Sequence, residues 1–70
     1  MRLSTRNQLA GTVTEVAVGA VMATVKVQLT GGDQVITASI TKEAVEELGL
    51  EVGRDTTVLV KSTEVMLGVE

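Results

Sequence analysis

The chain has 70 residues, of which 44% are apolar, and it contains no Cys, no His and no aromatic residue. This length allows one domain, residues 1–70, and a chain this short is only marginally stable alone. The missing Cys and His exclude disulfides and the common zinc sites as stabilisers. Oligomerisation remains, so we expect a homo-oligomer. The formal net charge of −3 and the absence of aromatic rings argue against nucleic-acid binding, which usually uses a basic surface and base stacking.

The start of the chain predicts no targeting segment. Residues 1–7 are short, polar and basic, without the apolar core of a signal peptide. No apolar run approaches the roughly 20 residues of a membrane-spanning helix. We therefore expect a cytoplasmic protein with no membrane partner.

Alternation of apolar and polar residues predicts two strands in the first 30 residues. The first covers residues 9–18, and its apolar positions change phase near Thr14 and Glu15, which predicts a bulge. The second covers residues 21–29, where every odd position is apolar. That pattern is typical of a strand with one buried face.

A hairpin turn and a third strand follow. Gly31 and Gly32 supply the positive φ angles that tight turns need, so residues 30–33 are predicted to reverse the chain. Residues 34–40 then form the third strand, with alternate apolar side chains facing inward.

A helix of about two turns is predicted next. Thr41 has the hydroxyl of a good N-cap, and Gly49 fits a left-handed C-cap followed by the apolar Leu50. Residues 56–61 and 64–69 read as two further strands, joined at Ser62 and Thr63. The sequence thus predicts an all-β fold, a five-stranded OB-like barrel with one short helix between strands 3 and 4.

Two polar segments interrupt this apolar pattern and are the candidate binding site. They are the N-terminal arm and the connection before the last strand, with the residues Ser4, Thr5, Arg6, Asn7, Lys61, Ser62 and Thr63. A tetrahedral dianion has acceptor oxygens only, so it needs cations, hydroxyls and N–H groups, and no carboxylate. Neither segment contains a carboxylate, and Glu64, which follows the second, should point away.

Plainer interpretations of the same residues exist. The arm has the composition of a solvated terminus, and Ser62 and Thr63 suit an ordinary turn.

Catalysis is not expected, because the acidic residues cluster at helical spacing as a solvated face (Glu43, Glu46, Glu47 and Glu51). A nucleophilic Ser–Lys pair formed by Lys61 and Ser62 is disfavoured too. Neighbouring residues on a strand point to opposite faces, so Lys61 would not activate the Ser62 hydroxyl directly.

Three segments of the chain resemble one known family. They are Ser4-Thr5-Arg6-Asn7 with the following residues to Val13, then Ile40 to Leu50, and finally Val60 to Met66. In this order and spacing they resemble the molbindins, stand-alone Mop domains that also occur in the TOBE regions of molybdate-responsive regulators and transporter ATPases. The resemblance covers essentially the whole chain.

The resemblance implies an OB-like barrel, a hexamer, and molybdate or tungstate bound at subunit interfaces without an organic cofactor. Carried over by position, Ser4, Arg6 and Lys61 would be oxyanion ligands, with Ser62 or Thr63 completing the set.

Two positions depart from the family pattern. Thr5 stands where the family usually has Ala, so an extra hydroxyl lies beside the site. Ser62 also stands where Ala is common, which leaves open whether Ser62 or Thr63 takes the hydroxyl role of the family. Asn7 would either orient the arm or contribute to a second class of site.

The predicted function is therefore intracellular binding and storage of molybdate by a non-enzymatic homo-oligomer. The sequence does not distinguish molybdate from tungstate as the ligand. It also does not distinguish storage from delivery or sensing as the role. The alternative is a structural or protein-interaction OB-like module without a small ligand.

Overall fold

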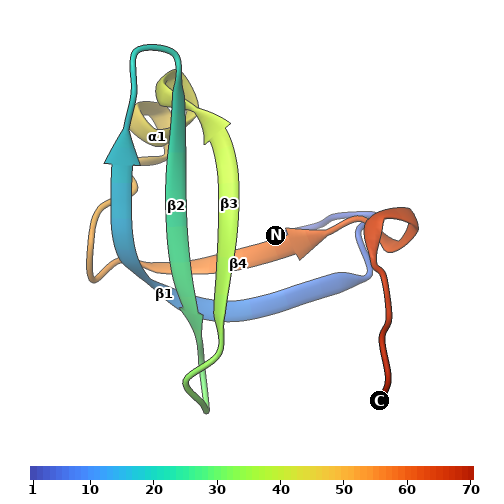
Figure 1. The fold of residues 1–70 in the computed structure, drawn as a ribbon. Helices are drawn as coiled ribbons and strands as arrows, with labels where there is room; N and C mark the ends of the chain where they lie inside the picture. The colour runs from blue at the N-terminus through green and yellow to red at the C-terminus, as the bar shows by residue number, and fades with distance from the viewer.

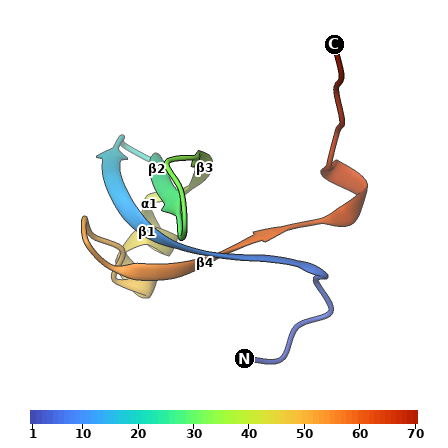
Figure 2. The same cartoon turned by 90° about the horizontal axis from the view of Figure 1, so that it is seen from below.

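The computed structural model describes residues 1–70, which form four strands and one α-helix (Figure 1). In chain order the elements are β1 (Asn7–Val18), β2 (Met22–Leu29), β3 (Val35–Thr41), α1 (Lys42–Leu48), β4 (Asp55–Val60) and a 3₁₀ turn, η1 (Ser62–Glu64). All neighbouring strands are antiparallel, in the order β3-β2-β1-β4. The sheet curls into a half-barrel with α1 on its concave side (Figure 2). None of the helices has the length and apolar character needed to cross a membrane.

The helix between the third and fourth strands is confirmed, together with both of its caps. The Thr41 hydroxyl accepts a hydrogen bond from the Ala44 N–H at 3.0 Å. Gly49 has a φ of 62°, and the N–H of Leu50 donates to the Val45 carbonyl at 3.1 Å, as in a Schellman motif.

The predicted fifth strand, residues 64–69, is wrong, so the sheet has four strands instead of five. Ser62–Glu64 form the 3₁₀ turn, and the chain after Val65 runs away from the sheet without a strand partner (Figure 1). The apolar pattern of this segment is suited to a strand, but a strand also needs a neighbouring edge within hydrogen-bonding distance. η1 directs the segment away from both free edges of its own sheet.

β1 is long and bent because it pairs with two different strands. Its first half pairs with β4, from Asn7 opposite Val60 onward, and its second half pairs with β2. This explains why the strand begins at Asn7, two residues earlier than predicted. The predicted bulge is confirmed by a register shift between Val13 and Glu15.

The core is small and aliphatic. Its buried side chains come from β1, β2 and α1: Val13, Ala23, Val25, Val27 and Val45. The alternation predicted for the second strand holds for Ala23, Val25 and Val27, which are buried, but not for Val21, which precedes β2 and is 70% exposed. Many large apolar side chains stay exposed in the single chain, including Leu48 at 61%. So small a core stabilises an isolated copy only marginally.

Gly11 lies where β1 passes from one partner strand to the other, and the two backbones meet closely there. A Cβ atom at this position would lie 2.5 Å from Cγ1 of Val27 and 2.8 Å from the carbonyl oxygen of Gln28. We expect Gly11→Ala to lower the free energy of unfolding by about 1–3 kcal/mol, because the core must shift to admit the methyl group. Urea denaturation measures the change.

Gly32→Ala is the matched control, because a Cβ atom there would meet nothing within 4 Å. An equal loss of stability in both variants would contradict the close approach at Gly11.

Candidate functional site

The pairing of β1 with β4 brings the two predicted polar segments together. The ladder ends with Asn7 opposite Val60, so the residues before Asn7 and after Val60 leave from the same end. They enclose a hollow of about 250 Å³ with no hydrophobic residue in its lining. The lining residues are Ser4, Thr5, Arg6, Lys61, Ser62 and Thr63. The structure thus places six of the seven predicted site residues around one space.

Asn7 is the exception, because its side chain links the two segments instead of lining the hollow. Its Nδ2 donates to the Val60 carbonyl at 3.0 Å and lies 3.4 Å from the Ser62 hydroxyl oxygen. Asn7 is half-buried, which restricts its side chain further. The geometry fits the orienting role, one of the two roles implied for Asn7.

Two further contacts hold the segments in place, and the sequence pattern did not reveal either. Nε2 of Gln8 donates to the Thr5 carbonyl at 2.8 Å, which ties the arm to the start of β1. The N–H of Glu64 donates to the Lys61 carbonyl at 2.9 Å and closes η1. A Gln in a strand carries no distinctive signal, and a turn of three residues has no periodicity to detect.

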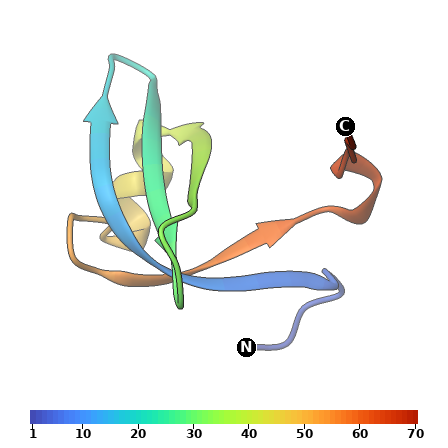
Figure 3. The same ribbon diagram turned by 60° about the horizontal axis from the view of Figure 1, so that its bottom comes forward.

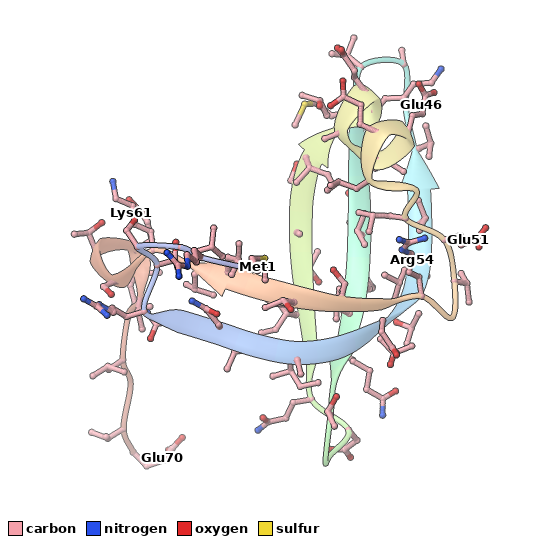
Figure 4. The ribbon with its side chains drawn as sticks, turned by 180° about the vertical axis from the view of Figure 1, so that it is seen from behind. Met1, Glu46, Glu51, Arg54, Lys61 and Glu70 are labelled. Atoms are coloured by element: carbon pink, nitrogen blue, oxygen red, sulfur yellow. The ribbon has the colours of Figure 1, made fainter.

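The hollow is lined by two positively charged side chains, Arg6 and Lys61, and neither is neutralised by an ion pair. The single ion pair of the structure joins Lys26 to Glu15 at 3.9 Å, so neither Arg6 nor Lys61 has a carboxylate partner. Glu64 is not part of the lining. Figure 4 shows Glu46 and Glu51 near the helical end of the molecule, far from Lys61 at the other end of the β1–β4 ribbon. Two positive charges therefore share a space with no compensating carboxylate.

The lining offers hydrogen-bond donors that suit an oxyanion. A guanidinium and an ammonium supply charge, and the four hydroxyls of Ser4, Thr5, Ser62 and Thr63 can each donate a hydrogen bond. Nowhere in the structure do three or more His, Cys, Asp or Glu side chains gather as ligands for a metal ion. Only Thr5 is half-buried among the lining residues, and the others are exposed, so one copy leaves the hollow open.

The profile of the TOBE domain matches residues 3–67 of the chain. A probable molybdenum-pterin-binding protein of Haemophilus influenzae is 43% identical over 70 residues, all of both chains. The chain belongs to the molbindin family of Mop-type TOBE domains. This confirms the family that the three sequence segments indicated.

Solved structures of similar proteins have the same fold. MopII from Clostridium pasteurianum, in an apo form, superposes with a TM-score of 0.90 at 41% identity, covering 97% of this chain and all of that one. The cytoplasmic molybdate-binding protein ModG, with molybdate bound, gives 0.92 at 48% identity. That match covers this whole molbindin chain and 49% of ModG.

Replacing Asn7 with Ala removes the side-chain link between the arm and η1. We expect faster hydrogen–deuterium exchange of the Glu64 and Val65 amides, because the Val60 carbonyl and the Ser62 hydroxyl lose their shared donor. Gln28→Ala is the control, since its side chain donates to the Gly32 carbonyl in the β2–β3 turn, away from the hollow. Unchanged exchange at Glu64 in Asn7→Ala would show that Asn7 does not order the site.

Proposed function

We propose that this molbindin binds molybdate reversibly in the hollow between residues 4–6 and 61–63. The observation that carries the proposal is a lining made only of cations and hydroxyls, with Arg6 and Lys61 free of any carboxylate. Relatives named for molybdenum-pterin binding and a molybdate-bound structural neighbour support the same ligand. No bond is made or broken, so the protein acts as a carrier of the anion and not as an enzyme.

Each lining residue has a role set by its chemistry. Arg6 presents a rigid fork of N–H donors that can contact two oxygens of the anion, while Lys61 contributes a compact positive charge. The hydroxyls of Ser4 and of Ser62 or Thr63 donate to the remaining oxygens. The Thr5 hydroxyl adds a further donor beside them.

We infer that a second copy of the chain closes each site. The lining residues are mostly exposed in one copy, and an anion there would stay in contact with water. Closure by another subunit removes that water and strengthens each charge-assisted hydrogen bond. A homo-oligomer, with the hexamer of the family as the expected form, would therefore hold molybdate at its subunit interfaces.

Selectivity against other oxyanions follows from size and protonation. Molybdate is larger than sulfate, so a site spaced for molybdate would contact sulfate less completely. Phosphate carries at least one proton at neutral pH, and this proton needs an acceptor in the site. The lining contains no carboxylate, which would be the strongest acceptor, and offers only hydroxyl oxygens for this proton. Tungstate matches molybdate in charge and nearly in size, so we expect it to bind as well.

The names of several relatives include a pterin, which raises the alternative of an organic molybdenum cofactor as ligand. A pterin is a flat ring system that proteins usually hold against apolar or aromatic side chains. This chain has no aromatic residue, and the hollow has no hydrophobic lining. The geometry therefore favours the inorganic anion.

The biological role we propose is storage and buffering of molybdate in the cytoplasm. ModG is a cytoplasmic molybdate-binding protein, which supports this placement. The competing hypothesis is a structural or protein-interaction module without a small ligand. Under that hypothesis Arg6 has no specific role, so its replacement should have the same effect as replacement of any other exposed arginine.

Arg6→Ala tests the assignment directly. We expect isothermal titration to show molybdate affinity reduced about 10- to 150-fold, since hydrogen bonds to a charged partner contribute about 1.5–3 kcal/mol. Arg54→Ala is the matched control, because Arg54 is also exposed but lies away from Lys61 (Figure 4). Equal affinities in the two variants would contradict the proposed site.

Molybdate should also stabilise the folded protein, because it binds the native state and not the unfolded chain. At a free concentration 100 times Kd, linkage predicts a gain of about 2.7 kcal/mol for one site, visible as a higher Tm. Sulfate and phosphate at the same concentration and ionic strength are the controls. Equal stabilisation by all three anions would indicate a general salt effect and contradict selective binding.

A further inference from the structure

One hydrogen bond holds the N-terminal arm, residues 1–6, which supplies half of the lining of the hollow. The arm precedes β1, and no backbone hydrogen bond of the turns and loops involves it. Among the side-chain hydrogen bonds only one reaches it, from Nε2 of Gln8 to the Thr5 carbonyl at 2.8 Å. Figure 3 shows the arm turning back at the end of the β1–β4 ribbon without a strand partner. Gln8 is therefore the residue that fixes the path of the arm.

Gln8 is well placed for this task, because its own backbone is fixed. It pairs with Leu59 in the β1–β4 ladder, next to the pair of Asn7 and Val60. Its side chain reaches back across two residues and closes a loop around Arg6 and Asn7. Asn7 in turn donates to the Val60 carbonyl at 3.0 Å. Two consecutive amide side chains thus hold the chain on both sides of Arg6.

The position of Arg6 before binding affects how tightly an anion is held. Arg6 is exposed, so without the Gln8 bond its backbone would sample conformations in which it lies away from Lys61. Ordering such a segment on binding costs conformational entropy. An anion would bind only the fraction of molecules with the arm in place, and the apparent affinity falls in proportion to that fraction.

We propose that Gln8 is a positioning residue of the anion site, which it orders without touching the anion. Gln8 is not in the lining of the hollow, so it acts through Thr5 and Arg6. The inference rests on the proposed function and gives a task in binding to a residue outside the hollow. A single neutral hydrogen bond changes an equilibrium about 2- to 12-fold, so the effect on affinity is smaller than the one expected for Arg6.

A matched pair of substitutions isolates the hydrogen bond. Gln8→Met removes the donor and keeps the length of the side chain. Gln34→Met is the control, because Gln34 is also exposed and borders the same surface depression as Gln8. The side chain of Gln34 makes no hydrogen bond in the structure. Both side chains are exposed, so neither substitution opens the core.

Backbone NMR relaxation without molybdate tests the ordering of the arm. We expect lower amide order parameters for Thr5 and Arg6 in Gln8→Met than in Gln34→Met or the unmodified protein, because no other hydrogen bond fixes the arm. Equal order parameters in the two variants would overturn the proposal.

Isothermal titration with molybdate, combined with dissociation rates from NMR line shapes, tests the effect on binding. We expect Kd to be about 2- to 12-fold higher for Gln8→Met than for Gln34→Met. The dissociation rate should stay the same, because the bound anion itself then holds Arg6. An equal Kd in both variants, or a faster dissociation with an unchanged arm, would contradict the positioning role alone. If the unmodified protein binds no molybdate, the proposed function fails and Gln8 has no anion site to order.

Discussion

The shared strand β1 is the constraint on which the rest of the structure depends. It pairs with β2 through its second half and with β4 through its first half, and Gly11 allows the backbone to pass closely between these partners. The first half and β4 form a two-stranded ribbon that projects from the half-barrel (Figure 3). A ribbon of two strands is only marginally stable alone. Its register nevertheless decides which residues meet at its far end, and those residues form the hollow.

The location of this hollow accounts for both its charge and its openness. At the far end of the ribbon, Arg6 and Lys61 lie away from the acidic residues of α1 and the following turn, so no carboxylate neutralises them. The same location leaves most lining side chains exposed, and the second subunit proposed above would exclude water from them. The proposed anion binding and the proposed closure by a second subunit therefore both depend on this one ribbon. A chain of 70 residues with so small a core is only marginally stable alone. Association with other copies of the chain would stabilise the fold and close the proposed site.

The elements that the sequence predicted well are those determined by local chemistry. The alternation in residues 21–29, the Thr41 cap and the positive φ of Gly49 each follow from a few neighbouring residues. The strand predicted at residues 64–69 failed because strand formation depends on a partner edge, which the apolar pattern does not specify. For the site, residue types indicated an anion and the family resemblance indicated which segments to combine. The contact between the segments comes from the register of Asn7 with Val60, 53 residues apart in sequence, and local pattern carries no information about it.

Molybdate held between Arg6 and Lys61, at a boundary between subunits, would join the site to the assembly. Anomalous diffraction at the molybdenum absorption edge, from crystals grown with molybdate, tests this most directly, because the signal locates molybdenum wherever it binds. We expect an anomalous peak close enough to both cationic side chains for the anion's oxygens to accept their hydrogen bonds, with atoms of a second copy completing its surroundings. A peak elsewhere on the molecule, or no peak at molybdate concentrations that saturate binding in solution, would contradict it.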